Sequence, residues 1–246
     1  MTAIQAMASP TAADHLFVFV FAVLYPLLGY VNFRRLQRRV RDGFDVPRRR
    51  MYLSTVTGHW ILAATAMVLW YRSGRPAESL GLHFEFGFGY VPALVIVAAA
   101  VAFLVHQLRS ARSGDREYLR AVERAFGSLA ILLPRSRREL DSFMFVGVTA
   151  GIVEELLWRG YLMAYLTHYL PLSVAVLLAI AGFGVAHAYQ GRRALPKVTA
   201  AGAVFMLLYL LTGSLWLAVL LHVAVDVLQG RMAWVVISRL QTGRGR

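Results

Sequence analysis

Three ionisable side chains, Glu154, His187 and His222, lie in separate apolar stretches of the sequence, where such groups are costly. A charged side chain at the centre of a bilayer costs at least about 2.5–3.5 kcal/mol on insertion scales, so it usually faces the protein interior and serves a function. None of the three has an obvious structural role in its own stretch. We therefore expect one shared site, in which carboxylate and imidazole groups could act as general bases, bind a metal ion or relay protons.

Two more charged side chains lie beside the first of these residues. Glu155 and Arg159 are four residues apart in the favourable acid-before-base order, so we expect them to form a structural ion pair. Glu154 is rotated by about 100° from Glu155 around a helix, which leaves it to face a different partner.

The same spacing of four residues recurs at both histidines. Phe183 precedes His187 on one helical face, so the phenyl ring could pack beside the imidazole. Asp226 follows His222 on another, where a carboxylate could hold the imidazole in one tautomer and orientation.

Other histidines of the apolar stretches are expected to have no catalytic role. We expect His59 to bond to a neighbouring backbone carbonyl, and His106 and His168, which lie at the ends of apolar stretches, to be interfacial.

The elements that carry these residues are predicted to be membrane-spanning helices. Hydrophobic residues make up 58% of the 246 residues and charged residues only 16%, against about 25% charged in a soluble domain. A helical span needs about 20 mostly apolar residues. The sequence therefore predicts an all-α, polytopic transmembrane helix bundle of about seven spans, within a range of six to eight. The predicted spans cover 16–33, 53–71, 88–106, 141–166, 171–188, 198–211 and 214–228.

The basic residues predict the orientation of these spans. Of 26 Lys and Arg residues, 23 fall in the four stretches 34–50, 107–140, 189–197 and 231–246. Seven spans place all four stretches on one side, so the N-terminus is predicted outside and the C-terminus inside. The net charge of +13 then indicates contact with anionic lipid head groups rather than nucleic acid. With no cysteine in the chain, disulfides and cysteine nucleophiles are excluded.

The chain divides into three predicted regions. Residues 1–140 supply N-terminal spans, basic cytoplasmic loops and, at 118–133, a possible interfacial amphipathic helix. Residues 141–230 are predicted to form the core that carries the candidate catalytic residues. Residues 231–246 form a basic C-terminal tail, whose apolar patch 232–237 could be a half-helix.

The order of the motifs is similar to that of a known family. Glu154-Glu155-x-x-x-Arg159, Phe183-x-x-x-His187 and His222-x-x-x-Asp226 on successive spans resemble the CPBP family, which comprises type 2, glutamate-type CAAX prenyl endopeptidases and bacteriocin-processing or immunity relatives. The resemblance covers roughly 141–230.

The resemblance implies a metal-free, cofactor-free endopeptidase in which Glu154 and His187 activate a water and His222 and Asp226 stabilise the oxyanion. Glu155, Arg159 and Phe183 would support the site. It further implies a multi-pass protein of a bacterial inner (plasma) membrane, with a membrane-associated or exported peptide or protein as substrate.

One position departs from many relatives, which have Asn where this chain has Asp226. An ionised Asp would repel an oxyanion, so Asp226 is either protonated or orients His222, and we favour orientation.

Three other functions fit the same polar groups. Glu154, His187 and His222 could bind zinc, although the compact His-Glu-x-x-His motif is absent. A proton-coupled transporter could use them as a relay, although internal repeats are absent. A catalytically silent immunity or scaffold protein could bind a peptide in the same site.

The predicted spans put the groups at different depths. Counting 1.5 Å per residue, Glu154 lies about 20 Å from the cytoplasmic face and His187 only about 6 Å. Glu154 and His187 can share a site only if their depths in the membrane are more similar than this count suggests.

Overall fold

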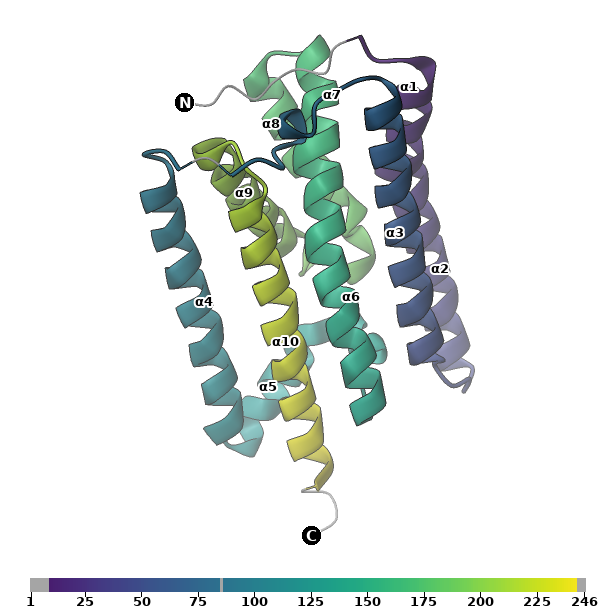
Figure 1. Ribbon diagram of the computed structural model, residues 1–246. Coiled ribbons are helices and arrows are strands. Elements are labelled where there is room, and N and C mark those ends of the chain that lie inside the picture. Colours follow the sequence, from purple (N-terminus) through teal and green to yellow (C-terminus); the bar gives the residue numbers. More distant parts are fainter. Residues whose placement is uncertain (1–8, 85, 243–246) are drawn as a thin grey trace.

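The computed structural model describes residues 9–84 and 86–242, and all regular secondary structure in that part of the chain is helical. Figure 1 shows a bundle whose described chain starts at one end and finishes at the other. Within these described residues, five helices are long and apolar enough to cross a membrane, and Leu172–Ala186 is a shorter apolar helix. These features confirm a polytopic helical bundle.

Each predicted span forms a helical column in chain order. The first column joins α1 (Ala12–Phe19), the π-helical η1 (Val20–Leu24) and α2 (Tyr25–Arg41). The next two are α3 (Arg48–Arg72) and α4 (Tyr90–Ser113), joined by a loop with the short η2 (Ala77–Leu80). The fourth joins α6 (Arg137–Glu155), the π-helical η4 (Leu156–Tyr161) and α7 (Leu162–Tyr169). The last three are α8 (Leu172–Ala186), α9 (Leu195–Thr212) and α10 (Trp216–Thr242), with η5 (Ala188–Gln190) between α8 and α9.

The predicted interfacial segment is also helical. It forms α5 (Arg116–Phe126) and the 3-10 turn η3 (Gly127–Leu132), capped at its start by the Asp115 carboxylate. Leu119 is buried with Val236 and Leu240 of α10. The predicted half-helix at 232–237 is wrong, because α10 continues without a break to Thr242. Residues 243–246 of the predicted tail lie outside the described residues.

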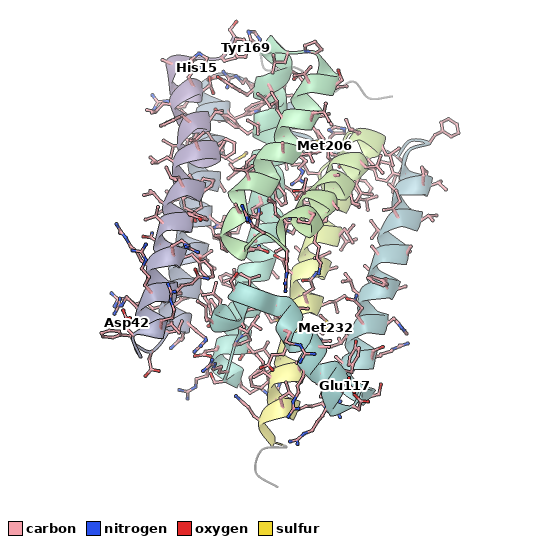
Figure 2. The ribbon with its side chains drawn as sticks, turned by 180° about the vertical axis from the view of Figure 1, so that it is seen from behind. His15, Asp42, Glu117, Tyr169, Met206 and Met232 are labelled. Atoms are coloured by element: carbon pink, nitrogen blue, oxygen red, sulfur yellow. The ribbon has the colours of Figure 1, made fainter. Side chains whose placement is uncertain are left out.

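The two ends of the bundle differ in chemistry. Figure 2 shows His15 and Tyr169 together at one end, and Asp42 and Glu117 at the other. Asp42 and Glu117 belong to two of the arginine-rich stretches, so these stretches lie at the same end, as the topology predicted. The assignment of that end to the cytoplasm stays a prediction.

Helix α6 approaches α10 closely because it carries two glycines on the facing side, four residues apart. A Cβ atom at Gly151 would lie 2.8 Å from the backbone nitrogen of Val223, and one at Gly147 would lie 3.0 Å from the Cβ of Asp226. Small residues at such spacing let membrane helices approach to backbone contact. The glycine face of α6 therefore fixes the distance between the two helices that carry most of the predicted site.

Helix α8 is short, and this removes the difference in depth that the sequence suggested. It has 15 residues, or about 22 Å. Glu154 precedes the turn at Leu170 by 16 residues, and His187 follows it by 17. The two residues thus lie at similar depths on antiparallel neighbours. The estimate from sequence was wrong because it placed 189–197 at the membrane face, whereas α8 ends beside Glu154.

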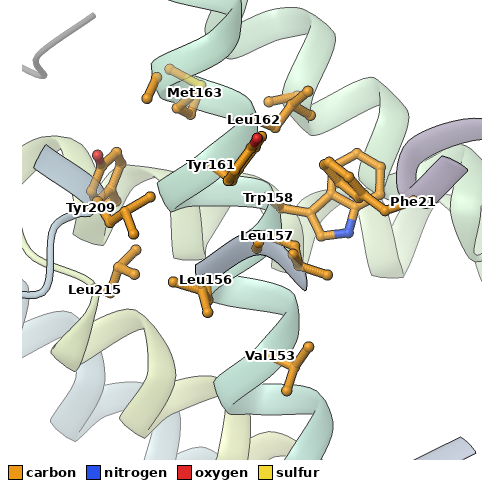
Figure 3. Packing of buried hydrophobic residues seen from close by; sticks show 14 of the residues in the cluster. Phe21, Val153, Leu156, Leu157, Trp158, Tyr161, Leu162, Met163, Tyr209 and Leu215 are labelled. Carbon is orange, nitrogen blue, oxygen red and sulfur yellow. The ribbon is translucent and has the colours of Figure 1, made fainter. Parts of the chain in front are cut away.

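The first helix is tied to the centre of the bundle by a buried polar cluster. Asp14 is fully buried and accepts hydrogen bonds from Arg75, at 2.8 Å from each of two guanidinium nitrogens, and from the hydroxyl of Tyr161. The carboxylate raises the pKa of Arg75 above its ordinary value. Figure 3 shows Phe21 and Trp158 facing each other nearby, with ring centroids 5.8 Å apart. The N-terminal column therefore packs directly on η4.

Candidate active site

Glu154 lies between two histidines from different helices. Its Oε1 is 3.2 Å from Nε2 of His59 on α3, and its Oε2 is 3.6 Å from Nε2 of His187 at the end of α8. The structure therefore brings Glu154 and His187 together, as predicted. It also corrects the expectation that the N-terminal region supplies only membrane spans and that His59 contacts only backbone.

The hydrogen bonds of His187 leave its Nε2 unprotonated when the ring is neutral. Nδ1 lies 2.8 Å from the carbonyl oxygen of Phe183, and because a carbonyl can only accept, Nδ1 donates. Glu154 Oε2 is buried and has no hydrogen-bond partner in the described part of the chain. The phenyl ring of Phe183 lies 4.5 Å from the imidazole, centroid to centroid, which confirms their predicted packing. An acceptor nitrogen and a free carboxylate oxygen thus face each other.

Glu155 connects Arg159 and His222 on another face of α6. Nη1 of Arg159 donates to Glu155 Oε1 at 2.9 Å, which confirms the predicted ion pair. Nδ1 of His222 lies 2.7 Å from the same oxygen. The second nitrogen of Arg159, Nη2, donates to the carbonyl oxygen of Gly202 on α9 at 2.8 Å. These contacts tie α6 to α9 and α10 through groups that are almost fully buried.

The orientation of His222 comes from Glu155 rather than from Asp226. The closest approach of Asp226 to the ring is 3.9 Å, from Oδ2 to Nε2, which exceeds hydrogen-bonding distance. With Nδ1 committed to Glu155, Nε2 points toward the side where Asp226 is 35% exposed. Our expectation that Asp226 orients this imidazole is therefore not matched by a hydrogen bond.

Aromatic rings from α8 and α9 pack against the charged groups. Phe205 stacks on His222 with centroids 4.6 Å apart and planes 16° apart. The guanidinium of Arg159 lies 4.4 Å from the centroid of Phe183 and 5.5 Å from that of Phe205. Sequence reasoning did not single out Phe205, because no spacing within its own helix links it to a polar residue.

A widened turn follows the two glutamates. Residues Leu156–Tyr161 form the π-helical η4, which interrupts the α-helix directly after Glu155. Such turns are frequent at functional sites. Glu155 directly precedes this turn and Arg159 lies within it, so their ion pair forms where the backbone departs from the α-helix.

The site residues do not converge on one point that suits a metal. In the part of the chain that the structure describes, no group of three or more His, Asp or Glu side chains is placed to hold a metal ion. The arrangement is instead two neighbouring clusters, one around each glutamate, on different faces of α6.

Comparison with protein families assigns the segment that carries these motifs. The family model of the type II CAAX prenyl endopeptidase Rce1-like proteins matches residues 137–228, which run from the start of α6 into α10. Searches of curated proteins and of solved structures gave no match. His59 lies outside the matched residues. Residues 137–228 therefore form a domain of the type II CAAX prenyl endopeptidase Rce1-like family, which confirms the family resemblance of the three motifs.

Proposed function

We propose that this protein is an intramembrane endopeptidase that uses a water activated by Glu154 and His187. The observation that supports this most is the pairing of Glu154 Oε2, which is buried without a partner, with the acceptor nitrogen of His187 at 3.6 Å. A water seated against both atoms could donate one hydrogen to each. Its oxygen would then be directed at a peptide carbonyl.

The second half of the site would stabilise the charge that this attack creates. His222 receives its orientation from Glu155 through Nδ1 at 2.7 Å, so a proton on Nε2 would point away from the carboxylate toward the substrate. Such a donor, fixed before the reaction, is worth about 2.7–4 kcal/mol in comparable oxyanion sites. Glu154 would finally pass the proton taken from water to the leaving amine nitrogen. Asp226 would line the substrate side.

The substrate we propose is a peptide segment of a membrane-associated or exported protein. The family's name refers to prenylated CAAX sequences, and the buried, membrane-embedded site suits a substrate that is held at the lipid surface. The arginine-rich end of the bundle would attract anionic head groups. The proposed location is a multi-pass position in a bacterial inner (plasma) membrane.

A cleavage assay tests this proposal. The purified protein in detergent is incubated with quenched fluorescent CAAX peptides, with and without a prenyl group, and with a library of unmodified peptides. We expect Glu154→Gln and His187→Ala to cleave roughly 10²–10⁴-fold more slowly than wild type. His106→Ala, a change of an exposed histidine on α4, is the matched control and should be unaffected. Wild-type rates in both site variants would refute the mechanism.

Three further measurements decide between the alternative functions. Activity retained after exhaustive chelation is expected, whereas a loss that zinc restores would establish the metalloprotease alternative. Binding of a peptide without any cleavage would establish a silent scaffold. Proton uptake into vesicles that depends on a solute and is lost in Glu154→Gln would establish a transporter.

A further inference from the structure

We propose that His59, from α3, is a positioning residue that carries the proton at its contact with Glu154 and so keeps that glutamate a carboxylate. The inference rests on the proposed function, because a general base must be unprotonated to accept a proton from water. It assigns a role to the N-terminal membrane region, which lies outside the matched family segment.

The hydrogen bonds of the imidazole determine which atoms can donate. Nδ1 of His59 lies 2.9 Å from the carbonyl oxygen of Thr55 and 3.3 Å from the hydroxyl oxygen of Tyr25. The carbonyl can only accept, so Nδ1 carries a hydrogen. A neutral ring then has a bare Nε2, which would face Glu154 Oε1 at 3.2 Å. Two bare acceptors repel, so one proton must lie between Nε2 and Oε1.

The charges around the site place this proton on the histidine. Arg159 is the one Arg or Lys that the described contacts bring to either glutamate, and it donates to Glu155. The ionisable groups around the contact between His59 and Glu154 are Tyr25 from α2, His187 from α8, Tyr189 from η5, and His222 and Asp226 from α10.

None of these groups is a fixed cation beside Glu154. A buried carboxylate without a cation is strongly disfavoured, and a protonated His59 supplies that cation at hydrogen-bonding distance.

The surrounding packing holds the ring in this position. The side chain of His59 is only 11% exposed, and the ring of Tyr25 meets it edge-on with centroids 5.8 Å apart. The neighbouring residue is Gly58, where a Cβ atom would lie 2.9 Å from the Tyr25 hydroxyl. The absence of a side chain at Gly58 therefore leaves the space that this hydroxyl occupies. The Thr55 carbonyl and the Tyr25 side chain together hold the imidazole against Glu154.

The proton count is unchanged over the proposed reaction. Water gives its proton to Glu154 Oε2, and Glu154 passes it to the amine nitrogen of the product. His59 keeps its own proton on Nε2 throughout, and its charge favours the carboxylate form before and after each turnover.

Nitrogen-15 NMR of the histidine-labelled, full-length protein in detergent tests the assignment without any substrate. We expect, besides the imidazole of His222, an imidazole with both nitrogens protonated whose signals vanish in His59→Gln and become those of a neutral ring in Glu154→Gln. His106→Gln serves as the control and should leave these signals unchanged. A neutral His59 in the wild-type protein would overturn the proposal.

Kinetics test its consequence for the reaction. Glutamine can still donate a neutral hydrogen bond to Glu154, so His59→Gln preserves the contact while removing the charge. We expect kcat to fall roughly tenfold or more with KM nearly unchanged, since a charge-assisted bond is about twice as strong as a neutral one. Unfolding temperatures of the variant and the wild type, compared in the same detergent, show whether the fold is retained.

Chemical rescue of His59→Ala distinguishes the effect of the charge of the imidazole from the effect of its shape. Added imidazole should restore activity to His59→Ala, whereas pyrazole, a ring of the same shape that is far less basic, should not. Equal rescue by both rings, or full activity of His59→Gln, would overturn the proposal. A protein that shows the protonated imidazole but cleaves no peptide would retain this assignment and refute the proposed function.

Discussion

Replacing Gly151 by alanine should separate the two helices that carry the site. The new Cβ atom would lie 2.5 Å from Cγ2 of Val223 and 2.8 Å from its backbone nitrogen. A side chain could rotate away, but the backbone contact can be relieved only by movement of α10. Ordinary van der Waals contact begins near 3.4 Å, so the helices must part by about 0.6 Å.

This displacement acts directly on the neighbouring residue, His222. Its 2.7 Å hydrogen bond to Glu155 would lengthen to about 3.3 Å, beyond the usual range for such a bond. Overpacking of this kind costs about 1–3 kcal/mol of stability. Misplacement by about 1 Å can lower a rate by about 10²-fold, so we expect a loss of roughly ten- to a hundredfold in kcat.

The control is the same substitution at Gly29 of α2, where a Cβ atom meets nothing within 4 Å. Thermal unfolding in detergent and peptide cleavage are measured for both variants and the wild type. Gly29→Ala should match the wild type in both assays. If Gly151→Ala also matched it, the close approach of α6 and α10 and its control over His222 would be wrong.

Three other substitutions test separate contacts. Arg75→Ala should destabilise the protein by about 3–5 kcal/mol because it leaves the Asp14 carboxylate buried without a cation. Adding Asp14→Asn to this variant should recover part of the loss in unfolding temperature. If nothing is recovered, the ion pair does not stabilise the fold. Arg159→Lys should lower the stability of the fold by about 2 kcal/mol or more, since one ammonium cannot replace the guanidinium that donates to both the Glu155 carboxylate and the carbonyl of Gly202. An unchanged unfolding temperature would show that these two hydrogen bonds do not stabilise the protein. Phe205→Leu should lower kcat several-fold with a stability loss of about 1–2 kcal/mol, because the imidazole loses its stacking partner; activity equal to wild type would show that the stacking does not position the ring.

The sequence predicted the helices and two contacts within single helical columns, because both depend on local patterns. Long apolar runs identify membrane helices, and the spacing of four residues predicted the pairing of Glu155 with Arg159 and of Phe183 with His187. Each of these contacts lies within one helical column, where spacing determines proximity.

Contacts between columns could not be predicted in the same way. His59 was expected to bond only to backbone, and it does bond to the Thr55 carbonyl, but its second nitrogen faces Glu154, 95 residues away. Glu155 was expected to pair with Arg159, and nothing in the sequence indicated that the same oxygen also meets His222. The depth of His187 required knowing that α8 stops after 15 residues. A count of residues from the turn at Leu170, rather than from the membrane face, would have suggested it.

The cluster of Asp14, Arg75 and Tyr161 has a consequence for how the protein is made. Asp14 is synthesised 61 residues before Arg75 and 147 residues before Tyr161. At about 5–20 residues per second, its carboxylate waits about 3–12 s for its cation. During that interval the first helix cannot take its final packed position without burying a carboxylate that has no cation. Defects in this cluster should therefore appear first as lost yield through quality control of the nascent chain, while the molecules that complete assembly cleave at a normal rate.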